Sequence, residues 1–488
     1  MGKKISIIGS GFAGISAAAY LAKAGNDVHV FEKNDQLGGR ARQFSSDGFT
    51  FDMGPSWYWM PDVFEKFFND FGHKVSDFYD LKRLSPSYRV FYPGDEIIDI
   101  PSSLEELYAL FERIEPGSTP HLKRFLNEAE FKYDIGISEM VQKPGRSITE
   151  FMDLELAKNA LKLDVFKPFS KYIRKYFKDP RLLQLLEFPV LFLGAMPKDI
   201  PALYSLMNYA DMALGTWYPM GGMHNIVEAM VKTAREQGVT FHTNSTVSEI
   251  KTLNKSASAI VIDGKEIKSD VVVGASDYQH TEQLLSKEHR NYDNNYWDKR
   301  VMAPSCLLYY VGVNKRLKNL LHHNLFFDED FAPHAEEIYA RPQWPTKPLF
   351  YVSCPSLTDP SVAPEGHENL FLLIPVAPGI KETPEIQNKY FDMIVNRLEQ
   401  RTGQTIKDSI VYKRSYAYSD FVKDYNSFKG NAYGLANTLK QTAILKPKLK
   451  SKKLNNLYFT GQLTVPGPGV PPAIISGEVV AREIEKDF

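Results

Sequence analysis

The chain of 488 residues has only two cysteines and no long run of apolar residues. Two thiols can form neither a disulfide framework nor a multi-thiolate metal site, so we interpret Cys306 and Cys354 as buried thiols in a reducing compartment. The 11 histidines show no HExxH spacing, and we therefore expect no metal. No stretch approaches the roughly 18 consecutive apolar residues that a membrane-spanning helix needs.

An excess of charge of one sign is also missing. The formal net charge is -1 and 24% of the residues are charged, which indicates neither a nucleic-acid-binding surface nor an acidic tail. We therefore expect no nucleic-acid partner. A hydrophobic content of 43% over this length predicts a large core and about two or three domains.

The first residues imitate two targeting signals. Lys3 and Lys4 precede an apolar run as in a signal peptide, and Met1, Gly2 and Ser6 fit a myristoylation pattern. The apolar run is only about five residues long and is needed as the first strand of a folded unit. We expect neither cleavage nor acylation.

A glycine-rich turn joins a β-branched strand, residues 5–8, to an alanine-rich helix, residues 15–24. The turn reads Gly9-Ser10-Gly11-Phe12-Ala13-Gly14. In this GxGxxG context, Gly9 permits the tight turn, Gly11 lets a pyrophosphate approach the backbone, and Gly14 lets the helix pack on the strand. The amides at the start of the helix then face the phosphates.

A lone carboxylate follows the next strand. Residues 27–31 predict that strand, and Glu32 after it is placed to bind both hydroxyls of an adenosine ribose. Gly38 and Gly39 extend the turn, while Arg40 offers a fixed cation to phosphate. The alternative makes Glu32 a solvated charge and the glycines ordinary turns, but the order of strand, helix, strand and acid favours a nucleotide site.

On these residues the chain resembles the FAD-binding amine oxidase and phytoene desaturase superfamily, whose N-terminal signature contains GxGxxG, an acidic residue and GGR. Further stretches, in the same order, resemble the bacterial and fungal carotenoid desaturases: residues 48–57 (GFTFDMGPSW), 87–89 (SYR), 215–222 (GTWYPMGG), 358–366 (TDPSVAPEG) and 456–474. The resemblance covers residues 3–485. It implies an α/β fold in which a Rossmann-like FAD-binding domain of the amine oxidase type carries a mixed-sheet substrate domain and a helical insert.

The resemblance assigns FAD-binding roles to the matching positions. These are Gly9, Gly11, Phe12, Ala13, Gly14, Glu32, Lys33, Gly38, Gly39, Arg40, Gly54, Pro55, Ser56, Val247, Gly461, Gln462, Gly469, Val470 and Ile474. In the family, the backbone at the position of Val247 contacts adenine, and the C-terminal stretch returns to the flavin with a helix N-terminus. Gln462, Val465 and Pro472 replace the family's alanine, histidine and glycine, which leaves the exact flavin contacts and the redox partner open.

The expected domains are discontinuous: an FAD-binding domain of residues 1–85, 220–285 and 430–488, a substrate domain of residues 86–100 and 286–429, and a helical insert of residues 101–219. The patterns predict strands at 241–243, 247–250, 270–274, 305–313 and 370–376, a hairpin of 259–262 with 265–267, and a helix at 384–401.

Basic and aromatic residues interleave within residues 161–196 of the insert. They are Lys162, Lys167, Lys171, Arg174, Lys175, Lys178 and Arg181 with Phe166, Phe169, Tyr172, Ile173, Tyr176 and Phe177. Such a helix suits the surface of an anionic bilayer, but the pattern also fits an amphipathic helix whose aromatic face packs inward. A water-insoluble substrate favours the bilayer. We therefore expect a cytoplasmic protein lying peripherally on the inner face of the cell membrane.

The resemblance implies an FAD-dependent carotenoid desaturase. The wording of residues 51–65 (FDMGPSWYWMPDVFE) is closer to phytoene desaturases than to 3,4-desaturases. The expected reaction converts phytoene by successive dehydrogenations toward lycopene, with hydride passing to the flavin. Because phytoene offers nothing to hydrogen-bond, we expect a long apolar tunnel, for which Trp57, Tyr58, Trp59 and Trp217 are candidate lining residues.

A proton must also leave the substrate, but no paired carboxylates stand out and no catalytic residue is assigned. Asp52 and Asp211 are candidates whose alternative role is structural. Quinone and oxygen are both candidates for the electron acceptor. Alternative functions are a carotenoid 3,4-desaturase, isomerase or ketolase, an amine or protoporphyrinogen oxidase, and a non-catalytic prenyl-lipid escort. The intact Gly38-Gly39-Arg40 and Gly461 argue against the escort.

Overall fold

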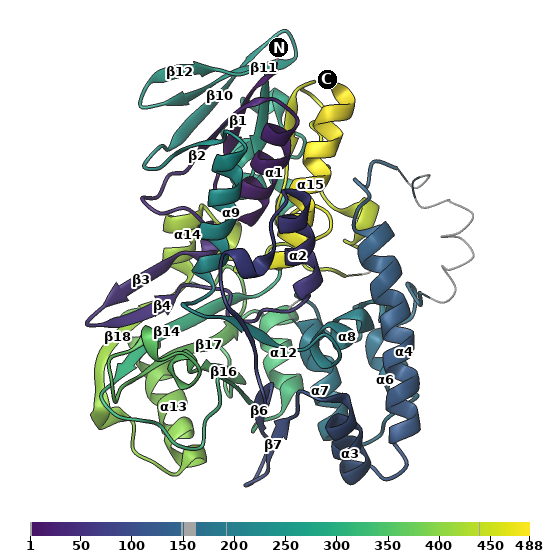
Figure 1. Ribbon diagram of the computed structural model, residues 1–488, viewed down its shortest axis with the longest axis vertical. Helices are drawn as coiled ribbons and strands as arrows, with labels where there is room; N and C mark the ends of the chain where they lie inside the picture. Colours follow the sequence, from purple (N-terminus) through teal and green to yellow (C-terminus); the bar gives the residue numbers. More distant parts are fainter. Residues whose placement is uncertain (1, 148–149, 151–162, 192, 439) are drawn as a thin grey trace.

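The computed structural model describes residues 2–147, 150, 163–191, 193–438 and 440–488. A parallel sheet of five strands, in the order β19-β13-β1-β2-β9, forms the upper part of the molecule in Figure 1. Its strands come from distant parts of the chain: β1 (Lys4–Ile8), β2 (Asp27–Phe31), β9 (Thr240–His242), β13 (Val271–Gly274) and β19 (Leu457–Phe459).

The first strand lies in the middle of this sheet. Ile5 pairs with Val28 of β2 on one side and with Val271 of β13 on the other. Both faces of β1 and β13 are buried, and their β-branched residues suit a parallel strand covered on both sides. The nucleotide turn therefore leaves the sheet at its centre.

Three helices cover the sheet: α1 (Phe12–Lys23), α9 (His224–Glu236) and α15 (Val470–Asp487). Helices α1 and α15 pack closely because Gly477 has no side chain, and a Cβ there would lie 2.5 Å from the Ala13 carbonyl oxygen. Gly14 has the predicted packing role, since its Cβ would lie 2.2 Å from the Gly9 oxygen.

A separate antiparallel sheet contains β10 (Val247–Leu253), β11 (Ser256–Ile262) and β12 (Lys265–Lys268). The hairpin of β11 and β12 matches the prediction. The strands predicted at 241–243 and 247–250 lie in different sheets, because β9 joins the parallel sheet and β10 pairs with β11.

A mixed sheet of seven strands, in the order β18-β14-β17-β16-β15-β6-β7, lies in the lower part of Figure 1. Its strands are β6 (Tyr88–Phe91), β7 (Ile97–Ile100), β14 (Ser305–Val313), β15 (His323–Phe326), β16 (Phe350–Ser353), β17 (Glu368–Val376) and β18 (Ile410–Tyr416). Alternate residues of β14 face opposite sides: Leu307 and Tyr309 pack beneath helix α13 (Pro384–Thr402), while Cys306 and Leu308 face the interior.

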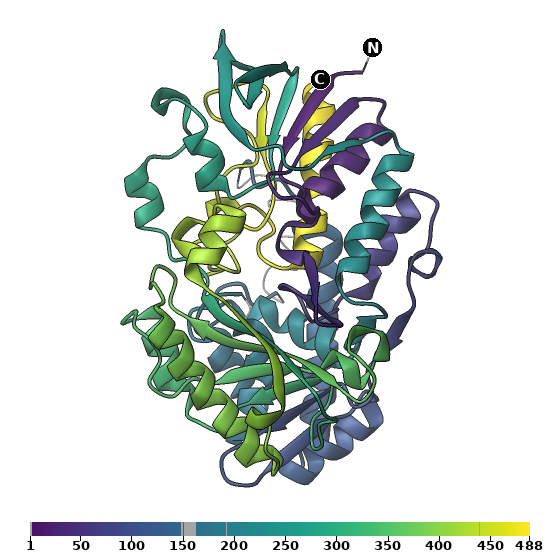
Figure 2. The ribbon, with the colours of Figure 1, turned by 90° about the vertical axis from the view of Figure 1, so that its left-hand side faces the viewer.

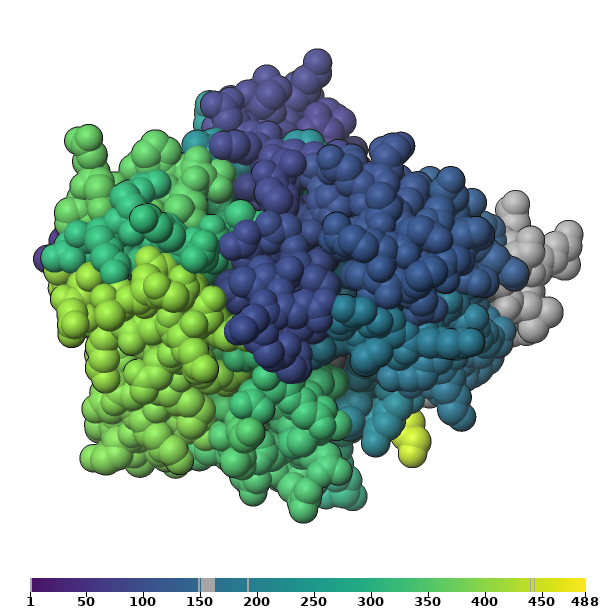
Figure 3. Space-filling model, turned by 90° about the horizontal axis from the view of Figure 1, so that it is seen from below, coloured from purple at the N-terminus to yellow at the C-terminus, as the bar shows by residue number. Residues whose placement is uncertain are grey.

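The helical insert stands beside the seven-stranded sheet. It includes α3 (Leu104–Ile114), α4 (Thr119–Ile135), α6 (Phe169–Ile173), α7 (Pro180–Leu191) and α8 (Leu206–Met212). Figure 2 shows the sheet and helices from a second side. Seen from below, β6 and β7, in dark blue, lie between the helical segment and the green part of the chain (Figure 3).

Shorter elements connect these layers. They are α2 (Pro61–Asp70), α10 (Tyr278–Gln283), α11 (Asn294–Asp298), α12 (Phe331–Tyr339), α14 (Tyr418–Tyr425), the hairpin of β3 (Gln43–Ser46) and β4 (Phe49–Asp52), and the pair of β5 (Leu81–Arg83) and β8 (Trp217–Pro219).

The aromatic face predicted for the membrane packs inward. Phe169, Tyr172, Ile173 and Phe177 are buried in the core of the insert, as the alternative interpretation requires. Phe166 is the exception, with 87% of its surface exposed. Lys162 and residues 161 and 192 of the same stretch lie outside the described residues.

Candidate active site

One cavity of about 980 Å³ runs from the glycine-rich turn to the inner face of the seven-stranded sheet. All of the predicted FAD-binding residues line it except Gly14 and Ile474. Gly14 packs under the turn, and the carbonyl of Ile474 accepts a hydrogen bond from Ser16 Oγ. The structure therefore gathers residues from both ends and from the middle of the chain.

The two glycine turns meet at the end of β1. Gly9 and Gly38 have φ values of 104° and 108°, in the left-handed region that favours glycine. The Gly38 N–H donates to the Ser10 carbonyl, and a Cβ on Gly39 would lie 3.2 Å from the Gly11 Cα. A Cβ on Gly11 would meet no atom within 4 Å, so the backbone there borders open space. This is the room that a diphosphate needs against a helix N-terminus.

The carboxylate of Glu32 is buried at the cavity wall. It accepts hydrogen bonds from Ser10 N at 3.0 Å and Ser10 Oγ at 2.7 Å, and from Asn34 N at 3.0 Å and Asn34 Nδ2 at 2.9 Å. These donors fix the carboxylate at the end of β2. A buried carboxylate in the wall of the cavity fits the predicted role of Glu32 as an acceptor for ribose hydroxyls.

Arg40 is the buried cation of the site. Its Nη2 donates to Ser427 Oγ and to the Asn431 carbonyl, each at 3.1 Å, whereas its Nε has no partner among the described residues. Burial lowers the pKa of Arg40, and the charge of Asp277 opposes that shift. A buried guanidinium with an N–H unpaired among the described residues, in the wall of the cavity that Gly11 also lines, fits an anionic diphosphate.

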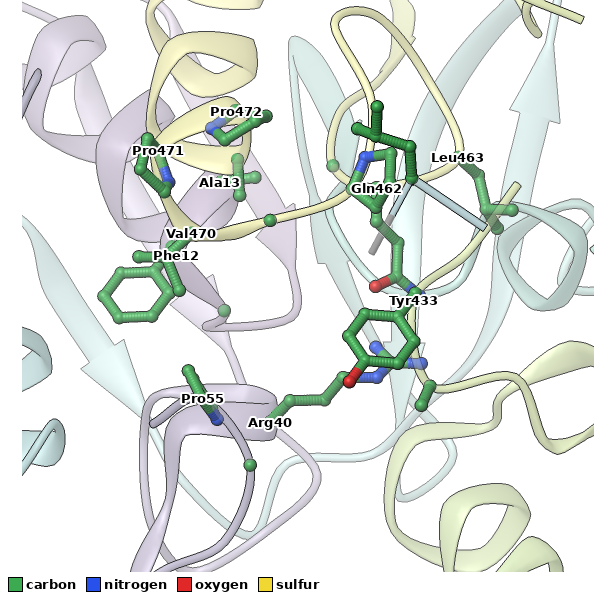
Figure 4. Close-up of a pocket in the computed structure, with 18 of the residues that line it drawn as sticks. Phe12, Ala13, Arg40, Pro55, Tyr433, Gln462, Leu463, Val470, Pro471 and Pro472 are labelled. Carbon is green, nitrogen blue, oxygen red and sulfur yellow. The ribbon is translucent and has the colours of Figure 1, made fainter. Parts of the chain in front are cut away.

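The C-terminal return completes the FAD-binding side. Figure 4 shows Arg40, Tyr433 and Gln462 gathered on one side of the pocket, opposite Phe12, Pro55 and Val470. Helix α15 begins at Val470, but the next two residues are Pro471 and Pro472. Because proline has no N–H, this helix N-terminus offers fewer donors than the resemblance suggested, and Val470 is the one of its first three positions that has an N–H to donate.

The rest of the cavity is lined mainly by apolar side chains, as a hydrocarbon site requires. They come from the inner face of the sheet, from α12 and from the insert, and include Phe188, Leu203, Met207, Leu308, Leu325, Phe327, Ile338, Leu349 and Leu373. Of the predicted aromatic lining residues, Trp57 and Trp59 face this cavity. Tyr58 and Trp217 do not, since Tyr58 is buried against Phe64 and the Trp217 indole donates to the Leu214 carbonyl.

Neither aspartate considered from the sequence lines the cavity. Asp52 accepts hydrogen bonds from the backbone N–H groups of Met223 and His224, and burial raises its pKa to about 6. Asp211 accepts from the Tyr88 hydroxyl at 2.7 Å, and burial raises its pKa to about 7. Both positions favour the structural alternative.

Sequence reasoning missed several polar residues of the cavity. Asp277, His334, Tyr351 and Tyr433 line it, each from an element distant in sequence from the glycine turns. No spacing pattern links them to the motifs, so only the fold reveals that they share one site.

The comparisons with known proteins agree with this geometry. Residues 12–485 match the family described as flavin containing amine oxidoreductase. The carotenoid 3,4-desaturase of Haloarcula japonica is 41% identical, covering 100% of this chain and 99% of that protein. The 4,4'-diapophytoene desaturase of Staphylococcus haemolyticus is 32% identical over 99% of both chains. The zeta-carotene-forming phytoene desaturase of Myxococcus xanthus is 30% identical over 99% of this chain and 94% of that protein.

Solved structures show the same fold at low sequence identity. An oxidoreductase from Methanosarcina mazei superposes with a TM-score of 0.66 at 18% identity, covering 98% of this chain and 100% of that chain. A fatty acid isomerase from P. acnes gives 0.60 at 15% identity, with 100% and 99% covered.

The fold and the match therefore define the class: an FAD-dependent oxidoreductase of the amine oxidase type, as predicted. Within that class, the chain belongs to the flavin containing amine oxidoreductase family and, through its full-length relatives, to the carotenoid desaturases. The cofactor is FAD, as the sequence indicated. Among the described residues, no helix has the length and apolar character needed to cross a membrane.

Proposed function

We propose that the protein desaturates a linear carotenoid at the end of its polyene, forming the 3,4 double bond. The observation that carries the proposal is that one cavity joins the nucleotide turns to an apolar sheet face. A hydrocarbon bound along that face would place its chain beside the cofactor with water excluded. The 41% identity to the Haloarcula japonica enzyme supports 3,4-desaturation over the other steps.

Different residues of the cavity would bind the cofactor and orient the substrate. FAD supplies the acceptor for a hydride when it is bound. Arg40 and the turn at Gly11 would hold its diphosphate, and Glu32 its ribose. The apolar residues of the sheet would orient the substrate, and orientation and desolvation are the main contributions that a protein can make to dehydrogenating an unactivated carbon pair.

Phytoene desaturation toward lycopene is the second candidate. The wording of residues 51–65 and the 30% identity to the Myxococcus xanthus enzyme support it. The two functions differ in the substrate consumed, so expression of the protein in one strain that makes phytoene and in another that makes lycopene separates them. A red-shifted pigment from lycopene, with phytoene unchanged, supports 3,4-desaturation. Red lycopene from phytoene supports the second candidate, and unchanged pigments in both strains refute both.

The cavity mouth supports uptake of the substrate from a membrane. Phe166 is 87% exposed and Leu445 is 49% exposed, and both line the cavity. Lys167 follows Phe166; its Nζ pairs with Asp164 at 2.5 Å, and 54% of its side chain is exposed. We propose that this mouth rests on the inner face of the cell membrane, where apolar side chains enter the bilayer and lysine meets anionic lipid. A quinone from the same membrane or dissolved oxygen would then take the electrons.

Flotation with anionic vesicles tests this placement. F166S should reduce the membrane-bound fraction, because it removes the most exposed large apolar side chain of the mouth. V411S is the matched control, since Val411 is 51% exposed on β18 and does not line the cavity. Equal flotation of F166S and the unmodified protein would contradict the placement.

A further inference from the structure

A buried tyrosine and histidine form a hydrogen-bonded pair in the wall of the hydrocarbon cavity. Tyr351 of β16 lines the cavity, and its hydroxyl lies 2.6 Å from His323 Nδ1 on the neighbouring strand β15. His323 is fully buried, and its Nε2 has no partner among the described residues. The pair is therefore isolated from solvent by the same walls that enclose the substrate site.

The pair stands where the FAD side of the cavity meets the apolar side. The Trp57 ring, which also lines the cavity, stacks on the His323 ring at 4.1 Å with an angle of 14° between the planes. Trp57 follows Pro55, which lies on the FAD-binding side in Figure 4, and Ser56, which also lines the cavity. A stacked indole stabilises a positive charge on imidazole.

Desaturation removes a proton as well as a hydride, and the residues described above leave the proton without an acceptor. Resting on the proposed function, we propose that Tyr351, backed by His323, is the catalytic residue that takes this proton. Loss of a hydride with its two electrons, which FAD would accept when bound, would leave the substrate as a polyenyl cation. The C–H bond on the adjacent carbon then breaks, and its electron pair becomes the new C=C bond.

The proton goes to the Tyr351 oxygen while the hydroxyl proton of Tyr351 passes to His323 Nδ1. Tyr351 is again neutral and His323 becomes an imidazolium, facing Trp57. The reverse transfers return the proton to water after the product leaves. Burial raises the pKa of Tyr351 and lowers that of His323, so both are neutral before the step. A weak base suffices, because a carbocation loses its neighbouring proton readily.

Two other titratable groups of the wall, His334 and Asp277, are engaged elsewhere. His334 also lines the cavity, but its Nε2 lies 2.9 Å from the Pro375 carbonyl and its Nδ1 accepts from Leu349 N. Asp277 lies on the FAD side, where it accepts a hydrogen bond from Phe428 N. Its charge opposes the lowering of the Arg40 pKa by burial. Tyr351 differs from both groups because its hydroxyl is hydrogen-bonded to a second side chain, His323, that can accept the hydroxyl proton.

The kinetic test follows FAD reduction by the carotenoid without oxygen, in Y351F, H323Q and the control Y309F. Tyr309 lies on the opposite face of the same sheet and donates to the Gln387 carbonyl at 2.6 Å, so Y309F also loses one hydroxyl hydrogen bond. Because hydride loss stays reversible until the proton is removed, we expect Y351F and H323Q to slow net FAD reduction about 100-fold or more with full FAD content, while Y309F reduces normally. The solvent deuterium isotope effect of the unmodified protein should disappear in Y351F. A Y351F rate within about threefold of the unmodified rate would overturn the assignment.

A second readout does not depend on turnover. Nitrogen NMR of the FAD-loaded protein without substrate, with the His323 signal assigned through H323Q, should show Nδ1 without a proton and Nε2 with one. A protonated Nδ1 would overturn the proposal, because His323 could not then accept the Tyr351 proton. If no carotenoid reduces the unmodified protein, the proposed function fails, and the NMR result still decides whether this pair can accept a proton.

Discussion

Replacing Arg40 by glutamine should weaken FAD binding about 10- to 100-fold. The substitution removes from the cavity wall the positive charge of Arg40 and its Nε, which has no partner among the described residues. A hydrogen bond to a charged group contributes about 1.5–3 kcal/mol, which corresponds to this range of affinity. Arg40 also donates hydrogen bonds to Ser427 and Asn431, so their loss should lower the melting temperature of the apoprotein as well.

The assay is a fluorescence titration of the apoprotein with FAD, paired with thermal unfolding. R89Q is the matched control, since Arg89 pairs with Asp99 at 2.6 Å between β6 and β7 and does not line the cavity. It should bind FAD as tightly as the unmodified protein does. An R40Q apoprotein that keeps the unmodified affinity would refute the assignment of Arg40 to the diphosphate.

Three further outcomes are expected. G14V should fail to fold or lose FAD, because its Cβ would lie 2.2 Å from the Gly9 oxygen; soluble, FAD-loaded G14V would contradict the packing of α1. Burial raises the pKa of Asp211 to about 7 from an ordinary value of 3.8, so unfolding releases a proton between these values and stability falls as pH rises through that window. D211N should therefore flatten the dependence of melting temperature on pH. An unchanged slope would contradict a raised pKa of Asp211 in the folded protein. L373W should narrow the apolar part of the cavity, so the rate of carotenoid turnover should fall while the FAD content measured by absorbance stays unchanged. Loss of FAD would contradict the position of Leu373 in the apolar part.

The nucleotide side of the site could be predicted because its chemistry is local in sequence. The turn from Gly9 to Gly14, the acid at Glu32 and the glycines before Arg40 each follow a strand or open a helix, and strand β2 has the predicted bounds. In such motifs the spacing of the residues along the chain predicts how they are arranged in space. The resemblance of the C-terminal stretch also predicted Gly461 and Val470 as FAD-binding residues, and both line the same cavity.

The substrate side could not be predicted in the same way. His323 and Tyr351 come from two separate segments, and only the pairing of β15 with β16 joins them. Periodicity also left the aromatic face of residues 169–177 open to two interpretations, since a bilayer and a protein core offer the same apolar surroundings. The contacts of that face with the core of the insert decide the matter.

The most direct test of the account is to mix the FAD-loaded protein with a linear carotenoid in the absence of oxygen and to record both absorption spectra. The shared cavity predicts that the flavin absorbance bleaches as the carotenoid spectrum shifts to longer wavelength, one new double bond for each FAD reduced. A carotenoid that remains unchanged beside fully oxidised FAD, for both phytoene and lycopene, would contradict it.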